Sequence, residues 1–454
     1  MNVLLPELTF VEGRFRPGFL VAWEDGRLNR VEPAHPDTEG IELPGRALIP
    51  GLVNAHSHGF QRAIRGRTEF RQPENTFDDF WSWRERMYQA ALGLSPDQLR
   101  RVTAMAYLEM LLSGVTSVGE FHYVHRQADG ASYDDPDELA LQVGAAAEDT
   151  GIRLRLLRVA YARAGFGAEP NPRQARFIDA HWEEVVAALE RLKGRLDVGL
   201  APHSVRAVPL DWLRPLGEYA RTHGLPLHMH VSEQPRELEE CKNEHGMQPI
   251  QLLEREGLID DRFTGVHAIH LAEEEVLSLG RHRATVCSCP TTERNLGDGI
   301  VAADRLLQAG VELALGTDSQ CQIDLFEDAR QLDYHLRLQR LERAVLDPRE
   351  GPGGMGRQLL RAATAGGARS LRLPVGAIEP GLRADLVALD LHDPSIAGAG
   401  AEELADMLVF AGGRLAIREV WVEGRQVVSE GRHPLQERIT REFLSTMEAL
   451  RGQG

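Results

Sequence analysis

The chain is organised around residues Pro50 to Arg67, PGLVNAHSHGFQRAIRGR, which place two imidazoles one residue apart directly after an apolar run. The run from Leu48 to Val53 has the short, bounded hydrophobic character of a buried strand. Alternate residues of a strand point to the same face, so His56 and His58 are predicted to converge on one ion. A catalytic zinc site needs about three protein ligands and an open position for water, so further ligands are expected elsewhere.

Composition and charge exclude several functional classes. The chain has 454 residues, 43% of them hydrophobic, which predicts a globular protein with one large domain and a smaller one. The net charge of −17 argues against a nucleic-acid partner, because phosphate contacts need a basic surface. An anionic substrate would therefore have to be held by specific arginines. No apolar run approaches the ~20 residues that cross a bilayer, and the start MNVLLPELTF lacks a secretory pattern, so we expect a cytoplasmic protein with no membrane partner.

The middle of the chain alternates between strand and helix patterns. Eight short apolar segments are the predicted strands: Ala47 to Asn54, Ser117 to His122, Arg153 to Tyr161, Asp197 to Ala201, Pro226 to Val231, Thr264 to His267, Ala284 to Ser288 and Glu312 to Thr317. Segments of helical periodicity, such as Leu99 to Leu112, separate them. Repeated strand and helix units imply a parallel sheet with right-handed crossovers. Eight such units predict an α/β fold, the (β/α)8 TIM barrel.

Both ends of the chain have the texture of short antiparallel strands, for example Gly18 to Trp23 and Ile417 to Val422. Neither end is long enough to bury a sheet face alone, so the two ends are predicted to form one small β-sandwich domain together. The predicted division assigns residues 1–46 and 376–436 to this domain, 47–375 to the TIM-barrel catalytic domain and 437–454 to a C-terminal helix.

Polar or ionisable residues follow six of the eight predicted strands. In a TIM barrel the chemistry lies at the C-terminal ends of the strands, so these residues are expected around one mouth. They are His56, His58, Glu120, His122, Tyr123, His203, Arg206, His228, His230, Glu233, His267, His270 and Asp318. Any one of these histidines alone is more often a hydrogen-bonded core or loop residue. A structural role does not account for all of them together.

A complete metal site can be drawn from this set. The predicted ligands are His56, His58, His230 and Asp318, with water in the remaining position. A bound ion would lower the pKa of that water from 15.7 toward about 7. Glu233 would then take the proton and pass it to a leaving group, while His267 would polarise the substrate or steady the attacking hydroxide. His228 competes with His230 for the ligand position, and His270 competes with His267, although the preferred residues fit the strand ends better.

Lysine and cysteine usage narrows the chemistry further. Of the 51 basic residues only Lys193 and Lys242 are lysines, and neither ends a predicted strand. A pair of ions bridged by a carbamylated lysine needs a lysine at such a place, so one metal ion is favoured. The four cysteines are too few and scattered for a disulfide framework, and the roles of two of them, Cys287 and Cys289, stay open.

The chain carries, in this order, the motifs PGLVNAHSH, HMHVSE, GVHAIHL and LGTDS, and through them it resembles the metal-dependent amidohydrolase superfamily. The ending PVGAIEPGLRADLVALDL is similar to the closing β segments of its deaminase branch. Within that branch the chain most resembles formimidoylglutamate deiminases of histidine degradation, through FWSWRERMY, GEFHYVH, APHSVRAV, HVSEQPRELEEC and CPTTERNLGDG.

The resemblance implies one zinc ion per chain on the four ligands already named, although imidazole and carboxylate also accept iron or manganese. It implies that Glu233 and His267 are catalytic and that the protein is a homodimer. It also implies substrate contacts from Gln61, Arg84, Tyr123, His203 and Arg206.

The implied substrate, N-formimidoyl-L-glutamate, carries two carboxylates, and Arg84 and Arg206 would hold them in bidentate fashion. Hydrolysis would give N-formyl-L-glutamate and ammonia. The alternative is a mononuclear-zinc deaminase of a ring such as guanine, cytosine or S-adenosylhomocysteine, whose pocket needs stacking and amide contacts. A non-catalytic binding protein on the same fold would be expected to lack one of the metal-binding residues or Glu233. This sequence retains all of them. The amphipathic segment Phe80 to Tyr88 is expected to cover the mouth, and whether it moves is open.

Overall fold

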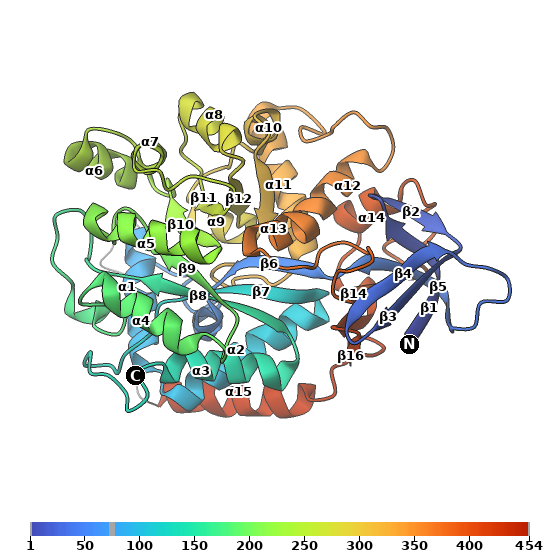
Figure 1. The fold of residues 1–454 in the computed structure, drawn as a ribbon, viewed down its shortest axis with the longest axis horizontal. Coiled ribbons are helices and arrows are strands. Elements are labelled where there is room, and N and C mark those ends of the chain that lie inside the picture. The colour runs from blue at the N-terminus through green and yellow to red at the C-terminus, as the bar shows by residue number, and fades with distance from the viewer. Residues whose placement is uncertain (1, 72–77, 453–454) are drawn as a thin grey trace.

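The computed structural model describes residues 2–71 and 78–452 and contains two sheets surrounded by helices (Figure 1). One sheet is a barrel of eight parallel strands in the order β13-β12-β11-β10-β9-β8-β7-β6. Its strands are β6 (Leu52–Ser57), β7 (Val115–His122), β8 (Arg153–Ala160), β9 (Val198–Pro202), β10 (Leu227–Val231), β11 (Phe263–His267), β12 (Thr285–Ser288) and β13 (Glu312–Leu315). The predicted TIM barrel is confirmed.

The barrel closes between its first and last strands, β6 and β13, at the residues predicted to bind metal. The backbone N–H of Asp318 donates to the carbonyl of His56, and the N–H of His58 donates to the carbonyl of Asp318, each at 3.0 Å. Below them the Asn54 side chain donates to Thr317 Oγ1 at 2.7 Å and accepts the Thr317 N–H at 3.0 Å. Closure of the barrel therefore fixes the relative positions of these ligands.

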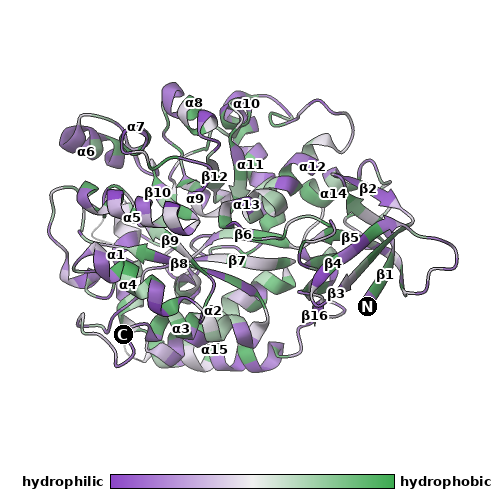
Figure 2. Cartoon of the chain, viewed as in Figure 1, coloured by the Kyte–Doolittle hydropathy of each residue, from purple (hydrophilic) through white to green (hydrophobic). Residues whose placement is uncertain are grey.

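Helices connect the barrel strands and pack around them. In chain order they are α1 (Phe80–Gly93), α2 (Pro96–Leu112), α3 (Glu138–Thr150), α4 (Trp182–Leu192), α5 (Leu210–His223), α6 (Pro235–His245), α7 (Pro249–Arg255), α8 (Glu273–Arg281), α9 (Pro290–Leu296), α10 (Ala303–Gln308), α11 (Leu325–Arg340), α12 (Gly354–Arg361), α13 (Gly367–Leu371), α14 (Leu404–Phe410) and α15 (Gln436–Arg451). Ser95 caps α2 in a capping box, an N-terminal signal that the sequence carries. Figure 2 shows hydrophilic residues concentrated on outer helices such as α6.

The second sheet joins the two ends of the chain, as predicted. It has the order β16-β15-β14-β5-β1-β3-β4, with β2 paired to β1. Its strands are β1 (Asn2–Val11), β2 (Arg14–Pro17), β3 (Phe19–Glu24), β4 (Arg27–Pro33), β5 (Ile41–Pro50), β14 (Leu386–Asp390), β15 (Ile417–Val422) and β16 (Arg425–Val428). The link is β5, which pairs in parallel with β1 and antiparallel with β14. Figure 1 shows this mixed sheet beside the barrel, with the N-terminus in it.

The strand predicted over residues 47–54 is wrong in one respect, because it is two strands in two sheets. Ala47 to Pro50 ends β5 in the mixed sheet, and the barrel strand β6 begins at Leu52. Gly51 lies at the crossing, where an added Cβ would meet Thr116 Oγ1 at 2.1 Å, so only glycine fits. Both flanking segments are buried, so the apolar run continues across the break and conceals it.

The C-terminal helix predicted over 437–454 corresponds to α15, and the last two residues of that range lie outside the described residues. In Figure 1 this helix lies beneath the barrel, beside α2. Among the helices of residues 2–71 and 78–452, none combines the length and apolar character needed to cross a membrane.

Candidate metal centre

Four side chains from three parts of the barrel converge at its C-terminal mouth. The Nε2 atom of His56 lies 3.2 Å from Nε2 of His58 and 3.0 Å from Nε2 of His230. The Oδ1 atom of Asp318 lies 3.3 Å from Nε2 of His56 and 3.1 Å from Nε2 of His58. All four residues are buried, and their ligand atoms lie within 4.8 Å of one another. The structure thus brings together the four residues predicted as ligands.

The spacing and protonation of this cluster suit a divalent cation. Bonds of about 2.0–2.1 Å in a tetrahedron place ligand atoms roughly 3.3 Å apart, close to the separations found here. Burial lowers the pKa of His56 to about 3 and the pKa of His230 well below its usual value, so both rings stay neutral, as ligands must. Burial opposes ionisation of Asp318, but the adjacent His56 and His58 outweigh it and lower the pKa of that carboxyl. Three imidazoles facing one carboxylate could hold a metal ion.

Hydrogen bonds decide which nitrogen and which histidine face the centre. Nδ1 of His58 donates to the carbonyl of Phe121 at 3.0 Å, which leaves Nε2 as the free lone pair. His228 donates from Nε2 to the carbonyl of Ser370 at 2.9 Å and stands outside the cluster. The two histidines of β10 share a face, but His228 lies one layer deeper in the barrel. The open choice between His228 and His230 is therefore resolved in favour of His230 as the residue in the cluster.

Glu233 and His267 lie together at the edge of the cluster. Nε2 of His267 is 3.6 Å from Oε1 of Glu233 and 3.8 Å from Oδ2 of Asp318. Burial raises the pKa of Glu233, and the charges of His267 and Arg206 partly offset that rise. Burial opposes protonation of His267, but Glu233 and other carboxylates outweigh it and raise its pKa well above the usual value. His270 is directed elsewhere and donates from Nε2 to the carbonyl of Asp298 at 2.9 Å.

Comparison with known proteins identifies the family. A model described as the amidohydrolase family matches residues 47–427. The chain belongs to the amidohydrolase family. A formimidoylglutamate deiminase from Pseudomonas aeruginosa is 41% identical over 433 residues, which cover 94% of each sequence. An 8-oxoguanine deaminase from the same organism is 30% identical over 409 residues, or 86% of each sequence.

Solved structures agree with this assignment. An amidohydrolase from Brucella melitensis matches with a TM-score of 0.91 at 33% identity, covering 99% of this chain and 100% of that one. The resemblance drawn from the sequence motifs, and the barrel with a mixed sheet from both chain ends, are both confirmed.

The site of this amidohydrolase also includes Glu293, whose role was not predicted from the sequence. Its carboxylate accepts the Cys289 N–H at 2.7 Å and the Ser288 hydroxyl at 3.0 Å, and it lies 3.3 Å from Nδ1 of His267. It therefore orients the His267 ring from behind. In the sequence Glu293 reads only as an acidic residue in the first turn of α9, which is an ordinary helix signal.

Backbone conformation at this mouth is unusual. Ser232, His267 and Asp318 have φ angles of 51°, 69° and 46°, in the left-handed region that non-glycine residues rarely adopt. Such conformations cost roughly 1–3 kcal/mol each and gather at functional sites. Here they turn the chain sharply at strand ends and direct the side chains of His267 and Asp318 toward the barrel axis.

The five predicted substrate contacts all line one pocket above the cluster, with α1 as one wall. They are Gln61, Arg84, Tyr123, His203 and Arg206. Nε2 of Gln61 donates to the Tyr123 hydroxyl at 3.0 Å. Helix α1, predicted to cover the mouth, contributes Arg84 together with apolar and aromatic side chains.

Some predicted strand-end residues do not enter the pocket of this amidohydrolase. Glu120 instead accepts the Ser57 hydroxyl at 2.7 Å and the Gly59 N–H at 2.6 Å, so it holds the turn that carries His58. Lys193 lies at the surface near Glu190, and Lys242 is exposed on α6. Neither lysine reaches the metal centre.

Proposed function

We propose that this amidohydrolase hydrolyses the formimidoyl group of N-formimidoyl-L-glutamate to give N-formyl-L-glutamate and ammonia, a step of histidine degradation. The observation that carries the proposal is a pocket in which two guanidinium groups, Arg84 and Arg206, line the wall beside the four-residue metal cluster. The 41% identity to a formimidoylglutamate deiminase over 94% of both sequences supports it.

The two arginines supply the charge that a dicarboxylate needs. Within the described chain, the buried Nε atoms of Arg84 and Arg206 have no hydrogen-bond partner. Arg206 is 4% exposed, and its nearest carboxylate contact is Oε2 of Glu233 at 3.9 Å. Guanidinium groups that keep free donors in a closed pocket favour bidentate binding of carboxylates. A net charge of −17 makes such local cations necessary for capture of an anion.

The metal is proposed to be one zinc ion per chain, held by three imidazole nitrogens and one carboxylate oxygen. His56, His58, His230 and Asp318 would hold it. When bound, such an ion supplies Lewis acidity that activates water and polarises the carbon to be attacked. Three imidazole nitrogens with one carboxylate oxygen would suit zinc, and the same ligands would also accept iron or manganese in an assay.

The protein's own groups would manage the protons. We assign Glu233 as the base that accepts a proton from the attacking water and returns it to the departing nitrogen, because its raised pKa makes the protonated form accessible. His267, held as a cation between Glu233 and Glu293, would donate a hydrogen bond to the oxygen or nitrogen on which charge develops as the reacting carbon becomes tetrahedral. The pocket wall from α1 would exclude bulk water.

The compartment, oligomeric state and domain division of the enzyme are also proposed. We propose a cytoplasmic homodimer, as the family resemblance suggests, and light scattering of the purified protein would test the mass. We also keep the proposed division into a barrel catalytic domain and a second domain from both chain ends.

The decisive experiment measures ammonia release from a panel of substrates by purified, metal-quantified protein. We expect activity on N-formimidoyl-L-glutamate and none on guanine, 8-oxoguanine, cytosine or S-adenosylhomocysteine. The ring substrates belong in the panel because the 8-oxoguanine deaminase is 30% identical and because Phe80, Trp83 and Tyr88 give the pocket aromatic walls. Activity on a ring alone would overturn the proposal.

A further inference from the structure

A hydrogen-bonded cluster of Tyr88, Tyr161 and Gln174 lies behind the arginine side of the pocket. Tyr88 comes from α1, Tyr161 follows β8, and Gln174 is in the short helix η2 (Pro172–Gln174). All three residues are buried, and both tyrosines line the pocket. The cluster therefore ties the helix over the mouth to the barrel and to the loop after β8.

The orientation of the Gln174 amide is fixed by a second contact. Its Oε1 accepts the backbone N–H of Asn171 at 3.0 Å, so a reversed amide would place two donors face to face. Nε2 consequently faces the tyrosines and donates to the Tyr88 hydroxyl at 3.0 Å and to the Tyr161 hydroxyl at 2.9 Å. Each tyrosine oxygen accepts one proton from the amide.

One of the two tyrosine hydroxyl protons has no acceptor within the cluster. The two hydroxyl oxygens lie 3.3 Å apart, so one hydroxyl donates to the other. A phenol has a single proton to donate, and the second hydroxyl proton has no acceptor among the residues that the structure describes. Burial raises the pKa of Tyr88 well above its usual value, so this hydroxyl stays protonated.

Two guanidinium groups and an imidazole lie beside the cluster. The Arg84 guanidinium carbon lies 5.5 Å from the centre of the Tyr88 ring, and the Tyr161 ring centre lies 4.5 Å from that of His203. Arg206 carries a free buried Nε on the same pocket wall. A spare O–H on this wall is available to an acceptor that a ligand brings into the pocket.

The geometry points to a specificity-determining role for this cluster. Tyr88 and Tyr161, oriented by Gln174, present one O–H to a substrate carboxylate and so complete the anion pocket that the arginines begin. The inference rests on the proposed function for the identity of the carboxylate. It adds that this side of the pocket selects a carboxylate over a carboxamide, because Arg84, Arg206 and the spare hydroxyl all offer protons there.

Because only one of the two hydroxyl protons is free, single and double substitutions of the tyrosines are expected to affect KM differently. In Y88F the remaining Tyr161 hydroxyl has a free proton, and in Y161F the Tyr88 hydroxyl has one, so each single variant should stay within about threefold of wild-type KM. The double variant Y88F/Y161F has no hydroxyl left, and its KM should rise about tenfold to hundredfold, the value of a hydrogen bond to a charged group. Calorimetric binding of glutarate, a non-reacting dicarboxylate, should weaken in parallel. Y219F, on α5, is the matched tyrosine control.

A second pair of variants tests whether the free hydroxyl proton is needed, and it leaves both tyrosines in place. In Q174E the carboxylate would still accept the Asn171 N–H, and its other oxygen would accept both tyrosine protons, leaving none for the substrate. N171D places a negative charge in the same loop but keeps the amide donor, so it controls for charge alone. Q174E should weaken glutarate binding at least tenfold more than N171D does. Circular dichroism and metal content report whether each variant is folded.

The outcomes separate the inference from the proposed function. A double variant within threefold of wild type, or a single variant as impaired as the double, overturns the inference. If the double variant fails to fold, equal effects of Q174E and N171D overturn it. If wild type binds glutarate with the expected variant pattern but releases no ammonia from N-formimidoyl-L-glutamate, the inference stands and the proposed function falls.

Discussion

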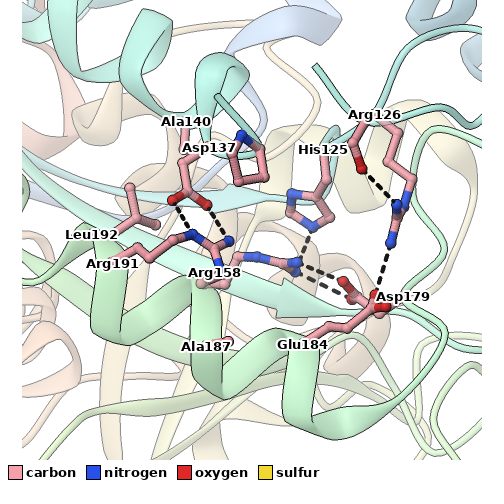
Figure 3. A pocket seen from close by; sticks show the side chains of 13 residues that line it. His125, Arg126, Asp137, Ala140, Arg158, Asp179, Glu184, Ala187, Arg191 and Leu192 are labelled. Atoms are coloured by element: carbon pink, nitrogen blue, oxygen red, sulfur yellow. Dashed lines mark hydrogen bonds and ion pairs between the residues drawn. The ribbon is translucent and has the colours of Figure 1, made fainter. Parts of the chain in front are cut away.

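Two polar cavities of the molecule differ in how their charged groups are paired. The pocket above the metal cluster contains guanidinium and imidazole nitrogens that, within the described chain, have no hydrogen-bond partner, including Nε of Arg84 and Arg206. The second cavity, drawn in Figure 3, lies between β8 and α4 and is also rich in arginine. There each arginine meets a carboxylate, in the pairs Arg158 with Asp179, Arg191 with Asp137 and Arg126 with Glu184.

Both cavities are built from the end of the same strand. Arg158 lies in β8 and Tyr161 directly follows it, and because side chains alternate along a strand they face opposite sides of the barrel wall. Asp179 links the two sides, since it binds Arg158 and also accepts the Tyr161 N–H at 3.3 Å. The difference between the cavities teaches that charge density alone does not mark a functional site. What distinguishes the first cavity is that two arginines lining it, Arg84 and Arg206, keep, among the described residues, a hydrogen-bond donor free for a ligand.

The largest effect is expected from removing a ligand. His230→Ala should sharply weaken metal binding and with it turnover, because two imidazoles and a carboxylate remain where four groups would hold the ion. His228→Ala, two residues earlier on the same strand, is the matched control and should keep the metal. Metal content by mass spectrometry and ammonia release measure both. Full metal occupancy in His230→Ala would contradict the assignment of His230, rather than His228, as a metal ligand.

The next effect concerns proton transfer. Glu233→Gln should keep the metal but lower kcat by about 10²–10⁴, the usual worth of a positioned acid or base. The variant preserves the size of the side chain, so the change isolates its proton. Metal content together with steady-state kinetics provides the measurement, and near-normal turnover would remove Glu233 from this role.

The second cavity should respond in stability rather than in turnover. Asp179→Asn leaves the 6% exposed Arg158 without its counter-ion and should lower the free energy of unfolding by about 3–5 kcal/mol. Glu184→Gln is the matched control in the same cavity. Its partner Arg126 is half-buried and Glu184 is 42% exposed, so about 0–1 kcal/mol is expected. Urea denaturation gives both values, and a loss of kcat without a loss of stability would contradict the structural role of this cavity.

The smallest effect is a pH dependence near the first cavity. Burial raises the pKa of Glu237 from 4.5 to about 7, with Arg206 opposing the rise. A carboxyl whose pKa is higher in the folded state favours folding below its unfolded pKa, and that contribution is lost as pH rises toward 7. Glu237→Gln should therefore gain stability relative to wild type between pH 4.5 and pH 7. Thermal midpoints of both proteins across that range are the measurement, and parallel curves would contradict the raised pKa.

Much of the fold could be predicted because its signals are local. Buried parallel strands read as short apolar runs, and the glycines and caps between them mark helix ends. The error at Gly51 shows the limit of that signal. Two buried strands of different sheets are equally apolar, so the turn between them depends on the close approach of Thr116, which is distant in the sequence.

The residue types of the site followed from the sequence, since strand ends in a barrel share one mouth and His56, His58, His230 and Asp318 follow such strands. Their convergence was decided by closure of the barrel, in which the backbone of Asp318 binds that of His56 and His58 across more than half of the chain. The roles of Glu293 and Gln174 also required the tertiary structure. Glu293 acts through His267 and Gln174 through Tyr88, and each partner lies on another element. The orientation of such a side chain depends on hydrogen bonds to these partners, which a local sequence pattern does not show.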